Sequence, residues 1–423
     1  MRPLLINSTN GSLSRALQLR EAVLLTFCDP LPAEYTRLLH LSRKDWQDLL
    51  HWLDTSGLAL YFFDRLEELG LLETLPIAVL TRLLQNLADN SERINAMITE
   101  SVAIQHRFQD AGLSYAVLKG FSLWPLSVPK LELRTQLDLD FLVEEEGVME
   151  ARHILEEFGY RMHAISGRSW EFKAGEHWPP SLDNLYKAGV SRSAELHLES
   201  PSRSGSSLLS RTQKRHFHGV LMPILSPVDL LLGQGLHLYK HVCSPCARTA
   251  HMIEFRRHVV ARFDDDGFWA QLQQCVSNVP ETSLRLGVVI LLISRTMGRF
   301  APHALSCWTV DHLPAKARLW VDLYGRRTAL ASFPGSKLYL LLENELESKG
   351  LVAKRSLRQA LLPRRLPPAI AHAVDGENYY VRLNRYYWQL HFIFFRLRFH
   401  LVEGVRYLYE LSIWRRYRNE LSK

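Results

Sequence analysis

Hydrophobic residues recur at helical spacing through the first part of the chain. Behind Pro76, apolar residues fall three or four positions apart, and this spacing predicts a helix that begins at the proline. They are Ile77, Leu80, Leu83, Leu84 and Leu87. Ser42 precedes a second such segment and is predicted to cap its first turn. We therefore expect residues 1–112 to form an N-terminal helical region without recognisable chemistry.

The pattern changes after Gly112 to short segments in which apolar residues are continuous or alternate with polar ones. Such segments predict strands at 114–118, 137–143, 170–173 and 194–198. A helical pattern at 144–158 separates the second strand from the third, and Gly159 is placed to end that helix. Strands with a single intervening helix indicate a small mixed sheet. The expected fold class is α+β, with residues 113–226 forming a mixed-sheet core between helical regions.

Helical spacing returns after a connector rich in serine at 199–211. Helices are predicted at 228–242, 247–262, 268–276 and 282–297, and proline residues at 363–368 indicate a linker. We expect residues 227–330 to form a helical domain that closes the cleft. Residues 331–423 would then form a basic aromatic helical tail.

Composition excludes several classes of protein. Of the 423 residues, 47% are hydrophobic and 22% are charged, which is typical of a globular protein rather than of a disordered or collagen-like one. Five scattered cysteines argue against a disulfide framework and favour a reducing compartment. Neither a signal-peptide pattern nor an apolar run of about 20 residues is seen in the sequence, so we expect a cytoplasmic protein.

The net charge of +7 is unevenly placed. From residue 351 onward there are 14 basic and 5 acidic residues, whereas the preceding part has 37 basic and 39 acidic ones. The body is close to neutral, which argues against a nucleic-acid partner, and the basic character belongs to the tail.

Two carboxylates on one predicted strand are the sharpest chemical feature. Asp138 and Asp140 are two residues apart, so on a strand both side chains project from the same face. Carboxylates held this closely repel each other unless a cation lies between them, and a hard ion with oxygen ligands such as Mg²⁺ suits that place. The alternative is an exposed strand face with two solvated aspartates, although aspartate is depleted in strands. Glu195, on another predicted strand, could complete a three-carboxylate site if the strands are neighbours; its alternative is a surface position.

An ordered set of short motifs resembles the uncharacterised nucleotidyltransferase family of the DNA polymerase beta-like superfamily. The resemblance spans roughly residues 100–300 and rests on Val117-Leu118-Lys119-Gly120, Arg134, Asp138-Leu139-Asp140-Phe141-Leu142-Val143, Gly159-Tyr160, Glu195-Leu196-His197, Asp229-Leu230-Leu231, His237, Lys240-His241 and Arg248. The wider superfamily has a Gly-Gly or Gly-Ser turn just before its aspartate pair. Here Lys119-Gly120 precedes Asp138 by a longer gap, which indicates an inserted loop at 124–133.

The resemblance implies nucleotidyl transfer with two Mg²⁺ ions and a nucleoside triphosphate (NTP) as substrate. Asp138 and Asp140 would hold both ions, and Glu195 would hold the ion that activates the attacking hydroxyl, acting also as its base. Gly120 would let the backbone approach a phosphate. Lys119, Arg134 and Lys240 would neutralise phosphate charge, the alternative for each being a surface cation.

Histidines and cysteines near residue 240 leave two alternatives open. His237 and His241 lie at i and i+4 on one helical face. With Cys243, Cys246 and His251 they permit a zinc site, but there is a single Cys-x-x-Cys and no second pair at finger spacing. We favour His237, Lys240 and His241 lining the NTP-binding cleft, with 243–246 forming a turn between helices.

Aromatic and basic residues are interleaved through 379–423. They are Tyr386, Tyr387, Trp388, Phe392, Phe394, Phe395, Phe399 and Trp414, with Arg382, Arg385, Arg396, Arg398, Arg406, Arg415, Arg416 and Arg418. A helix of this composition could pack on the protein with its arginines in solvent, contact an anionic membrane surface peripherally, or stack on nucleic-acid bases.

The sequence as a whole predicts a metal-dependent nucleotidyltransferase that moves a nucleoside monophosphate from an NTP to an unknown acceptor. The main alternative is a catalytically inactive member of the same fold that acts as a binding or scaffold protein. Two further alternatives are RNA modification and metal-dependent hydrolysis of phosphoesters. RNA modification predicts an affinity for RNA that falls steeply as the salt concentration rises, whereas hydrolysis would require no NTP.

Overall fold

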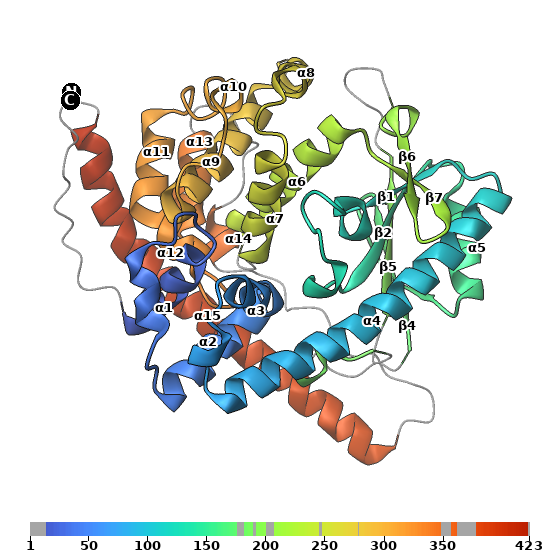
Figure 1. Ribbon diagram of the computed structural model, residues 1–423, viewed down its shortest axis with the longest axis horizontal. Helices are drawn as coiled ribbons and strands as arrows, with labels where there is room; N and C mark the ends of the chain where they lie inside the picture. The colour runs from blue at the N-terminus through green and yellow to red at the C-terminus, as the bar shows by residue number, and fades with distance from the viewer. Residues whose placement is uncertain are drawn as a thin grey trace.

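The protein places a seven-stranded sheet beside a large body of helices (Figure 1). The computed structural model describes residues 14–175, 182–188, 192–199, 207–244, 248–277, 279–347, 357–361 and 378–421. The expected α+β class with a mixed sheet flanked by helices is confirmed.

The sheet has the strand order β3-β4-β5-β2-β1-β7-β6. Its strands are β1 (Tyr115–Leu118), β2 (Asp138–Val143), β3 (Arg161–Ser166), β4 (Ser169–Ala174), β5 (Arg192–Leu198), β6 (Gln213–Phe217) and β7 (Val220–Ile224). β2 runs parallel to β5 and β1 runs parallel to β7, whereas the other neighbours are antiparallel. The four predicted strands are confirmed as β1, β2, β4 and β5; β3, β6 and β7 were not predicted.

One face of the sheet packs on α4 (Ile77–Asp110) and α5 (Val148–Glu157). Leu139, Phe141 and Val143 of β2 share a buried cluster with Phe108 of α4 and Ile154 of α5. Because side chains alternate along a strand, the residues between them project from the opposite face. The core on one side therefore fixes which side receives the two aspartates.

Two helix boundaries near the sheet refine the sequence predictions. The predicted helix at 144–158 begins at Val148, because residues 144–147 form a turn. Gly159 follows the end of this helix with φ of +83°, a left-handed conformation that suits glycine. Pro76 is the N-cap of α4 rather than its first residue.

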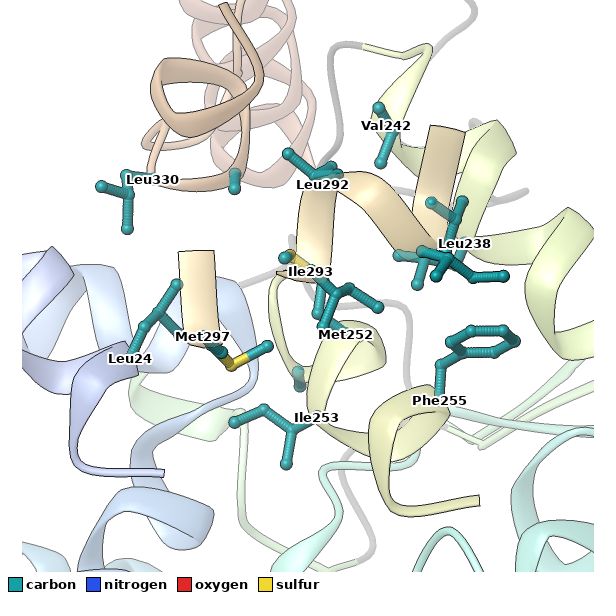
Figure 2. Packing of buried hydrophobic residues seen from close by; sticks show 14 of the residues in the cluster. Leu24, Leu238, Val242, Met252, Ile253, Phe255, Leu292, Ile293, Met297 and Leu330 are labelled. Atoms are coloured by element: carbon teal, nitrogen blue, oxygen red, sulfur yellow. The ribbon is translucent and has the colours of Figure 1, made fainter. Parts of the chain in front are cut away.

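The helical body is built from both ends of the chain. Its helices are α1 (Arg15–Leu25), α2 (Arg43–Ser56), α3 (Ala59–Glu68), α6 (Pro227–Val242), α7 (Ala250–Val260), α8 (Asp266–Val276), α9 (Pro280–Met297), α10 (His303–Ser306), α11 (Ala315–Trp320), α12 (Arg326–Ala329), α13 (Tyr339–Glu347) and α14 (Leu357–Leu361). Figure 2 shows Leu24 of α1 near Met297 of α9, in the same buried cluster as Leu238 of α6 and Ile253 of α7. The N-terminal helices and the helices after residue 226 thus share one core, and the boundaries at 112, 226 and 330 stay predictions.

Two helix starts follow the capping chemistry of their sequences. The Ser42 hydroxyl accepts a hydrogen bond from the Asp45 backbone N–H at 3.1 Å, as predicted for the start of α2. The Asp45 carboxylate accepts the Ser42 backbone N–H in return. Ser226 caps α6 in the same way through the N–H of Asp229.

The last helix, α15 (Tyr379–Glu420), differs between its two halves. Its second half packs on the helical body through Tyr407 and Trp414, which are 1% and 3% exposed. Its first half carries exposed aromatic residues such as Tyr380 and Phe394. Among the described residues, no helix combines the length and the apolar character needed to cross a membrane. The predicted linker at 363–368 lies outside the described residues.

Candidate functional site

Asp138, Asp140 and Glu195 lie on the two neighbouring parallel strands β2 and β5. Asp140 is the direct register partner of Glu195, and Asp138 lies opposite Ser193. Residues opposite each other on paired strands lie on the same face of the sheet, so the three acids share the face that α4 and α5 leave uncovered. The structure therefore places the three predicted metal ligands on one sheet face, where ligand atoms of Asp140, Glu195 and His197 lie within 4.8 Å of one another.

Two cationic side chains contact the central aspartate. The Nε2 atom of His197 lies 2.8 Å from Oδ1 of Asp140 and 3.2 Å from Oε2 of Glu195. The Lys119 ammonium donates to the same Asp140 oxygen at 2.7 Å. Asp140 itself is buried, whereas Glu195 and His197 are partly exposed. A single positive nitrogen thus bridges the carboxylates of two different strands.

These contacts determine the charge of each group at neutral pH. Burial opposes ionisation of Asp140, but hydrogen bonds from His197 and Lys119 outweigh it and lower the pKa of the carboxyl. The hydrogen bond from His197 likewise lowers the pKa of Glu195. Burial opposes protonation of His197, but its bonds to Asp140 and Glu195 raise the pKa of the imidazole to about 9. Two carboxylates and two cations therefore face one another.

Asp138 is compensated only in part, by the more distant charges of Lys119 and Arg134, and its pKa moves the other way. Burial, followed by repulsion from Asp140, raises the pKa of the Asp138 carboxyl to about 6. Ionising this carboxyl places a further negative charge beside Asp140 and Glu195. Of the three acids, Asp138 is therefore the one whose ionisation a bound cation would favour most.

A tight turn after β1 delivers Lys119 to this cluster. Both Lys119 and Gly120 have positive φ, of +46° and +39°. Such values suit glycine but are uncommon for a lysine, whose side chain is held here by Asp140. A Cβ on Gly120 would also collide with the side-chain amide of Gln136, which donates a hydrogen bond to the Asp138 carbonyl at 2.9 Å. A side chain at position 120 would therefore require Gln136 to move, and the positive φ would strain it further.

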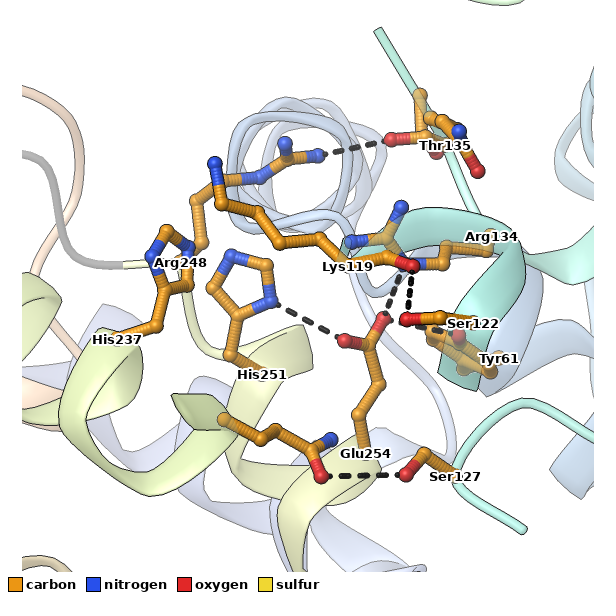
Figure 3. Close-up of polar contacts among 12 residues, drawn as sticks. Tyr61, Lys119, Ser122, Ser127, Arg134, Thr135, His237, Arg248, His251 and Glu254 are labelled. Carbon is orange, nitrogen blue, oxygen red and sulfur yellow. Dashed lines mark hydrogen bonds and ion pairs between the residues drawn. The ribbon is translucent and has the colours of Figure 1, made fainter. Parts of the chain in front are cut away.

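A cavity of about 250 Å³ adjoins Lys119 on the side of α6 and α7. Its polar lining includes Lys119, Arg134, His237, His251 and Glu254, and its apolar lining includes leucines from β1, β2 and α6. Figure 3 shows Arg134 and His251 directed toward Glu254 from opposite sides. A cavity with one apolar side and convergent polar groups is typical of a small-molecule site.

Glu254 is the centre of the polar network in this cavity. Its Oε1 accepts hydrogen bonds from Arg134 Nε at 3.0 Å and from the Tyr61 hydroxyl at 3.1 Å. Its Oε2 lies 3.2 Å from His251 Nδ1. Burial opposes ionisation of Glu254, but the Arg134 charge and the His251 hydrogen bond hold its pKa well below the usual range. Arg134, predicted as a phosphate ligand, thus lines the cavity with one N–H committed to a buried carboxylate.

The three residues predicted on α6 are placed differently from one another. His237 lines the cavity, and its Nε2 lies 3.1 Å from Nε2 of His241 one turn later. Burial lowers the pKa of His237 to about 2. Lys240 is exposed, and among the described residues it is not part of the cavity lining. The predicted turn at 243–246 falls partly outside the described residues.

Sequence reasoning assigned no role to two residues of this region, although one of them, His197, belongs to the motif Glu195-Leu196-His197. His197 follows Glu195 by two positions on one strand, so strand periodicity places both on the same face, and this signal could have found it. Glu254 carries no comparable signal, because its contact with Arg134 spans 120 positions in the chain.

Comparisons with known proteins identify a family for most of the chain. The profile of a family described as "Uncharacterised nucleotidyltransferase" matches residues 42–289. Among solved structures, the chain resembles an antigenic nucleotidyltransferase-like protein from Paracoccidioides brasiliensis, with 13% identity and a TM-score of 0.30 over 51% of this chain and 97% of that one. A search of curated proteins found no match.

Proposed function

This chain belongs to the uncharacterised nucleotidyltransferase family, and we propose that it moves a nucleoside monophosphate from an NTP to an acceptor hydroxyl or phosphate. The observation that carries the proposal is the meeting of Asp138, Asp140 and Glu195 on one sheet face, beside a cavity lined by Lys119 and Arg134. We also propose that the chain is related to the DNA polymerase beta-like superfamily and that it uses the two-metal mechanism of that superfamily.

The donor set of the sheet face fits hard divalent cations. Three carboxylates supply oxygen ligands of the kind that Mg²⁺ prefers. The bridging Nε2 of His197, at 2.8 and 3.2 Å from the two carboxylates, marks a point where positive charge is already stabilised. Asp138 and Asp140 would hold two Mg²⁺ ions and Glu195 one of them. When bound, such ions lower the pKa of an attacking hydroxyl and neutralise the charge of the phosphates.

The residues of the chain supply the remaining requirements of the transfer. The acceptor oxygen forms a bond to the α-phosphorus while the bond from that phosphorus to the bridging oxygen breaks, and pyrophosphate leaves. Glu195 is ionised and partly exposed, so it can accept the proton that the hydroxyl loses. Lys119 and Arg134 border the cavity and can pair with the negative charge of the departing pyrophosphate.

The position of the label distinguishes this reaction from its alternatives. The purified full chain is incubated with Mg²⁺, cell extract and each NTP labelled either at the α- or at the γ-phosphate. We expect the α-label to enter an acceptor and the γ-label to appear in pyrophosphate. Transfer of the γ-label to an acceptor would indicate a kinase, and release of inorganic phosphate without transfer would indicate hydrolysis. Either outcome would overturn the proposal.

A further inference from the structure

Three histidines from two helices meet beside the cavity. His237 and His241 lie on α6 and His251 lies on α7, and each offers a ring nitrogen within 4.8 Å of the others. The ring centroids are 4.5, 4.9 and 5.2 Å apart. From these residues we propose a second metal site, separate from the carboxylates, that binds Zn²⁺ or a similar d-block ion.

The spacing of the rings suits tetrahedral coordination. Two nitrogens that each lie about 2.0–2.1 Å from a tetrahedral zinc ion are about 3.3 Å apart, and the centroids of their rings are about 5 Å apart. The Nε2 atoms of His237 and His241 are 3.1 Å apart, and all three centroid separations lie close to the expected value. The nitrogens of His237 and His241 thus have the separation that a zinc ion needs, and a nitrogen of His251 lies within 4.8 Å of both.

The local sequence explains how the helices form this arrangement. Histidines at i and i+4 lie on the same face of α6, a spacing that also serves zinc in helical metal sites. α7 packs against α6 and supplies His251 at its start. Three nitrogen donors favour zinc and related ions over Mg²⁺, which prefers oxygen.

An outer carboxylate orients the third histidine. Glu254 lies 3.2 Å from Nδ1 of His251, which leaves Nε2 as the nitrogen available to a metal. Glu254 is fixed in turn by Arg134 and Tyr61, and both His251 and Glu254 are buried. A carboxylate that accepts the second N–H of a ligating histidine is a recurring partner of zinc sites, because it fixes the ring and its tautomer.

Three cations lie near the histidines. Lys119 is paired with Asp140 and Arg134 with Glu254, whereas Arg248, whose charge also acts on His251, donates a hydrogen bond to the Thr135 carbonyl. His237 and His251 also line the cavity, so the ion would lie at the cavity wall and join α6 to α7. The sequence pattern that had also suggested zinc included Cys243, but this residue is not one of the three that meet here.

Metal binding to the full chain tests this inference without any assay of transfer. The protein is stripped with a chelator, and Zn²⁺ is then titrated in competition with a chromophoric chelator. We expect one Zn²⁺ per chain, with an affinity at least about 10-fold lower in His237→Ala and in His241→Ala. Circular dichroism of the metal-free variants checks that they fold, and Co²⁺ in the wild type should give the visible bands of tetrahedral coordination.

Three variants serve as matched controls. Cys243→Ser removes the neighbouring thiol, Glu195→Gln alters the carboxylate site, and His106→Ala removes an exposed histidine of α4. All three should keep the wild-type affinity for zinc. Wild-type protein that binds no zinc above the level of His237→Ala would overturn the inference. So would a loss of zinc that follows Cys243→Ser or Glu195→Gln instead of the histidine variants.

Discussion

His197 occupies the space between two carboxylates of different strands, where nucleotidyl transfer would require a cation. Its Nε2 is within hydrogen-bonding distance of both Asp140 and Glu195, and Lys119 adds a second positive charge at Asp140. Without a bound ion, the site therefore neutralises two of its three acids with its own side chains. Asp138 is the acid that is compensated least, because burial and repulsion from Asp140 outweigh the attraction of Lys119 and Arg134.

Because the charge of Asp138 is only partly compensated, we expect Asp138→Asn to change the folding stability of the metal-free protein in a pH-dependent way. A chelator keeps the protein free of metal during the measurement. The pKa of Asp138 is raised to about 6 in the folded chain, so its ionisation disfavours folding once the pH exceeds that of an ordinary carboxyl. This loss of stability develops as the pH rises from about 4 to about 6, and it is complete above about pH 6. Asparagine cannot ionise, so at pH 7.5 the variant should be the more stable protein by roughly 1–3 kcal/mol.

At pH 4 the same substitution should change the stability much less, because the wild-type carboxyl is then largely protonated. Chemical denaturation at both pH values measures the difference. A variant that is less stable than the wild type at pH 7.5 would show that the Asp138 carboxylate is structural rather than held for a ligand.

The residues of the sheet face could be predicted where a local period places them. Asp138 and Asp140 follow the two-residue period of a strand, and Glu195 follows the same period on another strand. The sequence could not show that β2 and β5 are neighbours, because strand pairing depends on contacts between residues far apart in the chain. The three-carboxylate site was therefore predicted only on the condition that the two strands pair. The meeting of His251 with His237 and His241 depends on how two helices pack, which the spacing on α6 alone does not determine.

At the scale of elements, the strands that were missed lie at or near the edges of the sheet. β3 and β6 are the two outermost strands. Most residues of both strands are exposed or partly exposed, and the sequence of β6 is also largely polar. The alternation of apolar and polar residues that indicates a half-buried strand is weak in both, because neither face of these strands is deeply buried. β7 contains Pro223, which lowers its strand propensity.

The first half of α15 leads to a proposal about a partner surface. It extends beyond the helical body in Figure 1, and Tyr380 and Phe394 are 76% and 66% exposed. Exposed aromatic residues beside arginines are the composition of helices that lie on anionic membranes. We propose that this half of α15 contacts an anionic membrane surface peripherally, through its aromatic residues and through Arg396 and Arg398.

Vesicle sedimentation with phosphatidylserine-containing and neutral vesicles tests this contact. Arg396→Gln combined with Arg398→Gln should weaken binding to the anionic vesicles roughly 10- to 30-fold, since each basic residue near such a surface contributes about 1 kcal/mol. Arg415→Gln combined with Arg416→Gln, on the half of α15 that packs on the body, should have a much smaller effect. Equal binding by both double variants, or no binding by the wild type, would contradict the proposal.

At the scale of the whole molecule, one core connects helices from both ends of the chain. Leu24 of α1, Leu238 of α6 and Ile293 of α9 belong to the same buried cluster. Helical spacing predicted α6 and α9 as separate helices and α1 only as part of a helical region, and it gives no information on which distant helices share a core. The helical body supplies the cavity wall at α6 and α7, while the sheet supplies the carboxylates, so the proposed reaction depends on both parts of the molecule.

Pyrophosphate release by carboxylate variants tests the proposed activity most directly. The assay contains Mg²⁺, an NTP and the cell extract that supplies the acceptor. The rate of pyrophosphate release should fall at least about 100-fold in Asp140→Asn and in Glu195→Gln, because each substitution removes a charge from the reacting centre. Glu150→Gln, at an exposed position of α5, controls for the loss of an acidic residue elsewhere and should keep the wild-type rate. Thermal unfolding should show all three variants folded. Wild-type rates of pyrophosphate release in folded Asp140→Asn and Glu195→Gln proteins would contradict the three-carboxylate site.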